Sequence, residues 1–191
     1  MQANAALHNL GTDSLGNQLI YDTDFDITWY DYSNYGNWQS MMNWADGLTV
    51  DFGGTIIDDW RLPTALNQDG SGPCSGNCTD SEMGHLYYTE LGNVGYPTTG
   101  YGLSNTGDFQ NLQATNYFSG TEYSADPRVA WLFNIGSGRQ TSHRKGVSLY
   151  AIAVRPGDVS VAVAPEPVSM ILFGVGGVVM VARRKLMRRR G

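Results

Sequence analysis

Charged residues, cysteine and histidine are all scarce in this sequence, and each shortage excludes a class of protein. Only 16% of the 191 residues are charged while 12% are aromatic, the opposite of a disordered chain. The 24 glycines follow no three-residue period, which excludes collagen. The 2 cysteines and 3 scattered histidines make no four-ligand zinc motif. Since no P-loop, dinucleotide fingerprint or ordered Ser/His/Asp set is present either, the sequence does not indicate an enzyme.

The net charge of −6 hides two parts of opposite sign. All 18 acidic residues lie at or before Glu166, whereas half of the 12 basic residues follow it. Residues 1–167 therefore carry 6 − 18 = −12, and residues 168–191 carry +6. Because so acidic a body repels phosphate groups, we expect no nucleic-acid partner.

The uncharged segment 168–182, VSMILFGVGGVVMVA, predicts a single C-terminal transmembrane helix. A helix of this length spans about 22 Å, and the arginines that follow can snorkel to lengthen it. Since the basic tail 183–191 stays in the cytoplasm, the acidic body would lie outside. Export requires a signal peptide, and Ala3-Asn4-Ala5 fits the end of one, so residues 1–5 are read as its remnant before a mature start near Ala6. The alternatives are a buried core element for the tail and a chance Ala-x-Ala at the start.

The end of the chain also resembles a known sorting signal. It contains Pro165-Glu166-Pro167 in a linker of residues 159–167, then the apolar run, then Arg183-Arg184-Lys185, in the order of a PEP-CTERM signal. The resemblance implies export through the inner membrane of a Gram-negative-type bacterium and recognition by an exosortase, a membrane transpeptidase. It further implies an inner-membrane anchored protein with an extracytoplasmic domain, which reaches the cell surface or the extracellular matrix after processing.

Residues 6–158 predict one domain with short aromatic strands, two helices and long irregular loops, which is an α+β pattern. The first helix is expected from a cap at Asn37 to Leu48. The second is expected at 81–91, with Thr79 and Glu82 as a capping box and Gly92 as a left-handed stop.

This body resembles the Lcl C-terminal family, the C-terminal domain of a collagen-like bacterial adhesin. The matching segments are Asp26–Trp29, Trp60–Thr64, Tyr117–Glu122, Ala130–Phe133 and Tyr150–Pro156. The RLPT element also occurs in formylglycine-generating enzymes, which implies a C-type-lectin-like fold whose first and last strands pair. Those enzymes depend on a late cysteine pair, and no cysteine follows Cys78, so their activity is not carried over.

Cys74 and Cys78 predict a disulfide in an oxidising compartment, with free thiols or a metal or redox role as alternatives. Asn67, Asp69 and Ser71 supply oxygen atoms at alternate positions, as in the first half of a calcium loop, but the acidic residue that would close it is missing. The alternative is a polar, Gly-rich turn, so calcium is the one cofactor that the sequence suggests.

Several tyrosines in polar, Gly-rich surroundings are candidates for stacking on sugar rings: Tyr30, Tyr32, Tyr35, Tyr96 and Tyr101. The body's only basic cluster in the sequence is Arg139, Arg144 and Lys145, so a neutral or calcium-bridged polysaccharide fits better than an anionic one. The sequence thus predicts a non-enzymatic surface or matrix protein that binds extracellular polysaccharide. The alternatives are a purely structural matrix component and a secreted enzyme of unknown type.

Overall fold

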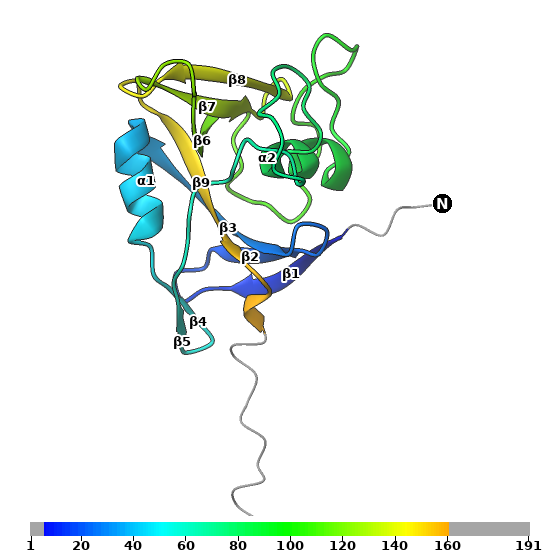
Figure 1. Ribbon diagram of the computed structural model, residues 1–191. Coiled ribbons are helices and arrows are strands. Elements are labelled where there is room, and N and C mark those ends of the chain that lie inside the picture. The colour runs from blue at the N-terminus through cyan, green and yellow to red at the C-terminus, as the bar shows by residue number, and fades with distance from the viewer. Residues whose placement is uncertain (1–5, 161–191) are drawn as a thin grey trace, which may run out of the picture.

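The computed structural model describes residues 6–160, which are built around one large mixed sheet (Figure 1). Seven strands lie in the order β1-β2-β3-β9-β6-β7-β8, and β4 and β5 form a separate hairpin. All pairs are antiparallel except β6 with β9. The strands are β1 Leu7–Thr12, β2 Gln18–Asp22, β3 Ile27–Gly36, β4 Val50–Phe52, β5 Thr55–Ile57, β6 Asn116–Glu122, β7 Val129–Asn134, β8 Arg139–Arg144 and β9 Leu149–Pro156. The helices are α1 Trp38–Asp46, α2 Glu82–His85 and the π-helix η1 Leu86–Glu90.

The sheet separates two hydrophobic cores. Successive side chains of a strand point to opposite faces, so the central strand β9 contributes Ala151 and Ala153 to one core and Ile152 and Val154 to the other. Helix α1 covers the first core, while α2 and η1 cover the second, and the helices lie on opposite sides of β9 (Figure 1). Burial on both faces explains why β9 is apolar throughout its buried stretch, residues 151–154.

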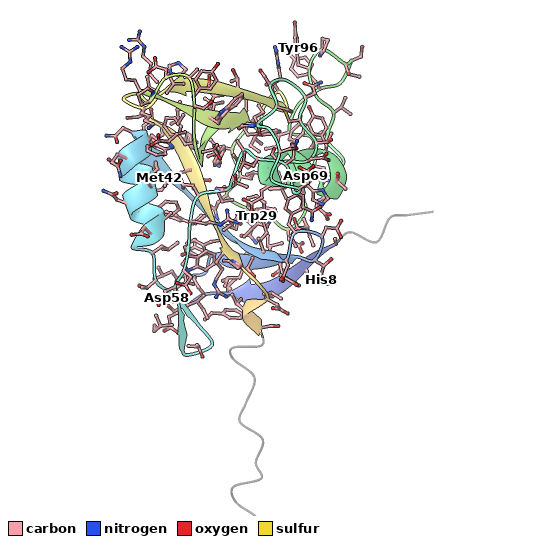
Figure 2. The ribbon with its side chains drawn as sticks, viewed as in Figure 1. His8, Trp29, Met42, Asp58, Asp69 and Tyr96 are labelled. Atoms are coloured by element: carbon pink, nitrogen blue, oxygen red, sulfur yellow. A yellow bond between two sulfur atoms is a disulfide. The ribbon has the colours of Figure 1, made fainter. Side chains whose placement is uncertain are left out.

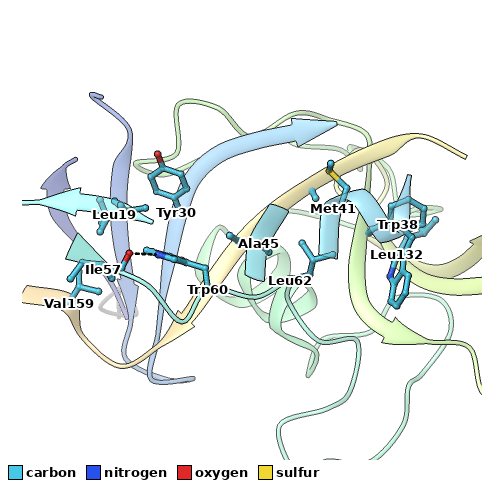
Figure 3. Packing of buried hydrophobic residues seen from close by; sticks show 14 of the residues in the cluster. Leu19, Tyr30, Trp38, Met41, Ala45, Ile57, Trp60, Leu62, Leu132 and Val159 are labelled. Atoms are coloured by element: carbon cyan, nitrogen blue, oxygen red, sulfur yellow. Dashed lines mark hydrogen bonds between the residues drawn. The ribbon is translucent and has the colours of Figure 1, made fainter. Parts of the chain in front are cut away.

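Helix α1 closes the first core with Trp38, Met41 and Ala45 (Figure 3). Its start is as predicted, because the Asn37 side chain accepts a hydrogen bond from the Ser40 amide at 3.0 Å. The helix ends at Asp46, two residues before the predicted end at Leu48.

The second helical segment begins with a different cap from the one predicted. Ser81, not Thr79, accepts from the Gly84 amide, at 3.3 Å. The Glu82 carboxylate accepts hydrogen bonds from Arg61 and from the Thr64 amide, so it is not available for a capping box. After four residues the α-helix widens into η1, and Gly92 follows with φ +62°, the left-handed conformation that was predicted for it.

The predicted fold class, an α+β domain with a C-type-lectin-like arrangement and a C-terminal transmembrane helix, is corrected to a mostly-β domain. The helices are short, with 9, 4 and 5 residues. The expected pairing of first and last strands is wrong as well, because β1 lies at the sheet edge beside β2 while β9 lies between β3 and β6. The sequence understated the sheet because β1 and β8 are polar strands with little apolar alternation.

Within residues 6–160, no helix has both the length and the apolar character needed to cross a membrane. The predicted transmembrane segment 168–182 lies outside the described residues. So do residues 1–5, the motif Pro165-Glu166-Pro167 and the basic residues Arg183, Arg184 and Lys185.

Candidate functional site

The five candidate tyrosines do not form one surface. Tyr30 is only 3% exposed and belongs to the first core. Its hydroxyl donates to Asp13 Oδ2 at 2.7 Å and accepts from Asn17 Nδ2 at 2.7 Å. Buried in this way, Tyr30 has no ring face to offer a ligand, so its assignment to a binding surface is wrong.

Tyr32 and Tyr35 lie on β3 and are exposed, but they pack against different neighbours. The Tyr32 ring lies 6.2 Å from Trp44, which packs on the first core. The Tyr35 ring lies 5.1 Å from Tyr150, which packs on the second core. Because they belong to opposite sides of the sheet, these two tyrosines cannot contact the same sugar.

Tyr96 and Tyr101 do form a pair. Their ring centroids are 5.2 Å apart at 90°, and the residues are 45% and 49% exposed. The Arg139 guanidinium lies 5.9 Å from the Tyr96 centroid, and the exposed Asn77 donates to the Tyr96 carbonyl at 2.9 Å. We call Tyr96, Tyr101, Arg139 and Asn77 the aromatic patch. Figure 2 shows Tyr96 at the end of the molecule remote from His8.

The segment 92–116 that carries the two tyrosines is fixed by side-chain hydrogen bonds, although it contains little regular structure. Asn93 is 4% exposed, and its Oδ1 accepts from the amides of Ser104 and Asn105, both at 2.9 Å. The Tyr87 hydroxyl, on η1, donates to the carbonyls of Val94 and Gly102. Because these contacts hold the loop before a ligand arrives, binding would cost less conformational entropy.

The predicted basic cluster is divided by the structure. Arg139 begins β8 and belongs to the aromatic patch, whereas Arg144 ends the same strand. Lys145 follows Arg144, and its Nζ lies 4.1 Å from the Trp38 ring centroid and 2.7 Å from Glu122 Oε1. Only one of the three cations can therefore serve a ligand on the patch.

The cysteine segment supports the same patch. The sulfurs of Cys74 and Cys78 lie at bonding distance, with Cα atoms 6.0 Å apart. Gln140 on β8 donates to the Cys74 carbonyl at 2.9 Å, and Gly76 pairs with Gln140 through the backbone. The short loop thus holds Asn77 beside the strand that carries Arg139.

The candidate calcium residues hydrogen-bond mainly to one another. Asn67 Nδ2 donates to Ser71 Oγ at 3.0 Å, and the Ser71 amide donates to Asp69 Oδ1 at 2.9 Å. Hydrogen bonds from Ser71 hold the pKa of Asp69 below its usual value. These contacts are those of a polar turn, and calcium binding here stays a prediction.

A second cluster, which the sequence did not predict, combines Asp22, His85 and Glu90. One oxygen of each carboxylate and one ring nitrogen of His85 lie within 4.8 Å of one another. His85 Nε2 is 3.0 Å from Glu90 Oε1 and 3.4 Å from Oδ2 of a third carboxylate, Asp24. Burial raises the pKa of Asp22, and burial together with the charge of Asp22 raises that of Glu90.

No local sequence signal could reveal this cluster. Asp22 ends β2, far along the chain from the helix. His85 and Glu90 are five residues apart, a spacing that puts side chains on different sides of an α-helix. They meet because η1 is a π-helix, whose i→i+5 turn brings these positions together and which often occurs at functional sites.

Comparison of the chain with protein-family models, curated proteins and solved structures finds no match. The chemistry of the residues must therefore carry the functional argument. Tyrosine rings can stack on the apolar face of a sugar, and Arg139 and Asn77 can donate to its hydroxyl groups. A histidine among carboxylates instead offers the side-chain types that can ligate a metal ion.

Proposed function

We propose that this protein is an exported, non-enzymatic surface or matrix protein of a Gram-negative-type bacterium, which binds extracellular polysaccharide through the aromatic patch. Its C-terminal PEP motif would be recognised by an exosortase, and the protein would then reach the cell surface or the extracellular matrix. The sorting step is supported by the order of Pro165-Glu166-Pro167, the apolar run and Arg183-Arg184-Lys185. Polysaccharide binding is supported by the exposed, rigidly held pair Tyr96 and Tyr101.

The charge of the body selects the kind of polysaccharide. Residues 1–167 carry −12 by the count of Asp, Glu, Lys and Arg, and of Arg139, Arg144 and Lys145 only Arg139 belongs to the patch. A polyanionic chain would be repelled over most of this body. A neutral sugar can stack on the tyrosines while Arg139 and Asn77 donate to its hydroxyls, so a neutral polysaccharide is the proposed ligand.

The binding step can be tested with the 191-residue protein on an array of neutral, uronic-acid and sulfated polysaccharides. Tyr96→Ala and Tyr101→Ala are each expected to weaken binding to a neutral glycan about tenfold, equivalent to ~1.4 kcal/mol. Tyr35→Ala is the matched control, because Tyr35 is 58% exposed but lies outside the patch. Equal binding by all variants would refute the role of the patch, and no binding by the wild type would favour a structural matrix component.

The sorting step needs a separate measurement in a host that has an exosortase. Replacing Glu166 by Ala should prevent processing and keep the protein off the cell surface, while Tyr96→Ala should be sorted normally. Protease added to intact cells reports the location of the body. If the body resists digestion until the cells are lysed, the proposed export is wrong, whatever the glycan array shows.

A further inference from the structure

The cluster around His85 provides a second site, independent of the polysaccharide proposal. We infer that Asp22, His85 and Glu90 bind one zinc(II) ion, with the more exposed Asp24 as a fourth ligand. The four side chains offer one imidazole nitrogen and three carboxylates, a donor set that zinc accepts.

The spacing of the donor atoms fits a tetrahedral ion. Zinc–nitrogen and zinc–oxygen bonds of about 2.0–2.1 Å separate neighbouring ligand atoms by roughly 3.3–3.4 Å. His85 Nε2 lies 3.0 Å from Glu90 Oε1 and 3.4 Å from Asp24 Oδ2, and the atoms of Asp22, His85 and Glu90 all lie within 4.8 Å. The ligand atoms of Asp22, His85 and Glu90 therefore need only small movements to surround one ion, and Asp24 would join them through its 3.4 Å approach to His85.

Asp22 gives the strongest indication that a cation belongs here. The residue is 0% exposed, and its Oδ1 accepts from the amides of Asp24 and Phe25. Its Oδ2 is buried and has no hydrogen-bond partner among the described residues. Trp29 Nε1 is also buried and has no hydrogen-bond partner within residues 6–160. A buried carboxylate oxygen left without a donor is costly unless a cation binds it.

The surroundings favour a transition metal and hold the ligands in place. When ionised, the three carboxylates bring three negative charges close together, and a divalent ion would reduce this excess. Imidazole ligands select zinc and its neighbours over calcium or magnesium. Glu90 Oε2 accepts from the Ala6 amide at 3.0 Å, which leaves Oε1 facing His85, and the Phe25 ring packs 4.7 Å from the imidazole. Such outer contacts fix the direction of metal ligands.

The test is a calorimetric titration of the chelator-treated 191-residue protein with zinc chloride. We expect one zinc per chain, no competition from a tenfold excess of calcium, and visible absorption typical of four-coordinate cobalt(II) after cobalt substitution. Asp22→Asn and Glu90→Gln keep side-chain shape and should each lower zinc affinity more than tenfold, and His85→Gln should abolish the cobalt spectrum. Circular dichroism of each variant confirms that it is folded.

The matched controls are His8→Gln and His143→Gln, because both histidines are exposed and could hold zinc adventitiously. If zinc binding is lost in these variants but kept in His85→Gln, the inference is overturned. It is also overturned if the wild type binds no zinc.

Discussion

Arg61 and Glu82 form a bidentate ion pair that attaches the start of helix α2 to the sheet. Arg61 Nη2 lies 2.6 Å from Glu82 Oε1, and Nη1 lies 2.9 Å from Oε2, which also accepts from the Thr64 amide at 2.7 Å. The Arg61 backbone pairs with Val154 of β9. The two side chains differ in exposure, with 41% for Arg61 and 5% for Glu82, and this difference predicts unequal effects of removing each partner.

Arg61→Met leaves a buried carboxylate without its counter-ion. Loss of one partner of a buried pair costs 3–5 kcal/mol, and because Arg61 is partly exposed we expect the lower part of this range, about 3–4 kcal/mol of unfolding free energy. Glu82→Gln keeps an oxygen acceptor for Thr64 and leaves an arginine that water can solvate, so we expect about 1–2 kcal/mol. The double variant should be more stable than Arg61→Met alone, since the unpaired charge is gone.

Urea unfolding followed by tryptophan fluorescence measures these differences, with equal m-values as the check that the unfolded states are comparable. Arg128→Met is the matched control, because the Arg128 side chain is 83% exposed in its pair with Asp126 and its loss should change stability by less than about 0.5 kcal/mol. The reasoning fails if Glu82→Gln costs as much as Arg61→Met, or if the double variant is the least stable of the three.

Three further predictions concern the core, the acid response and the metal. Leu132→Ala, at a residue 1% exposed, should cost 2–5 kcal/mol in the same assay, whereas Leu15→Ala, at 82% exposure, should cost less than about 0.5 kcal/mol. Burial alone would raise the pKa of Asp13, but hydrogen bonds from Tyr30 and neighbouring groups outweigh it and hold that pKa below 3.8. Its contribution to stability is therefore fully present well above pH 3.8 and is lost as pH falls through 3.8 toward the lowered value, so the stability of Asp13→Asn should fall less steeply with pH than that of the wild type there. Free zinc at a hundred times its Kd should raise the unfolding free energy by about 2.7 kcal/mol relative to chelator, and this gain should be absent in Asp22→Asn; a gain of equal size in that variant would place the ion elsewhere.

Local signals in the sequence predicted the parts of the fold that depend on neighbouring residues. The Asn37 cap and the left-handed Gly92 are as expected, because each is decided by residues within one turn. The cap of the second helix was misassigned because Glu82 has a stronger partner in Arg61, which is distant in sequence. The balance of helix and sheet was misjudged because polar edge strands take their structure from pairing with β2 and β7, and not from their own residues.

Among the candidate tyrosines, the sequence could not distinguish a buried ring from an exposed one. Tyr30 and Tyr32 are separated by one residue in similar polar surroundings, yet one is 3% and the other 42% exposed. The difference arises because β3 is paired with both β2 and β9 at Tyr30, whereas Tyr32 lies beyond the last pair with β2 and within the irregular stretch between Tyr30 and Asn34. Both rings lie on the side of the first core, so their different burial depends on where the neighbouring strands pair, which the residues around each tyrosine do not reveal.

The helical segment of α2 and η1 supports both the aromatic patch and the proposed zinc site. His85 and Glu90 contribute metal ligands, while Tyr87 donates to the loop that carries Tyr96 and Tyr101. The Tyr88 hydroxyl donates to the Gly138 carbonyl at 2.6 Å, directly before Arg139. A bound ion would restrain α2 and η1, and the hydroxyls of Tyr87 and Tyr88 on η1 position the aromatic patch. A His85 variant could therefore lose glycan binding even though the sugar does not contact the metal site. The two sites are separated only by variants such as Tyr101→Ala, which remove a ring of the patch and touch no metal ligand.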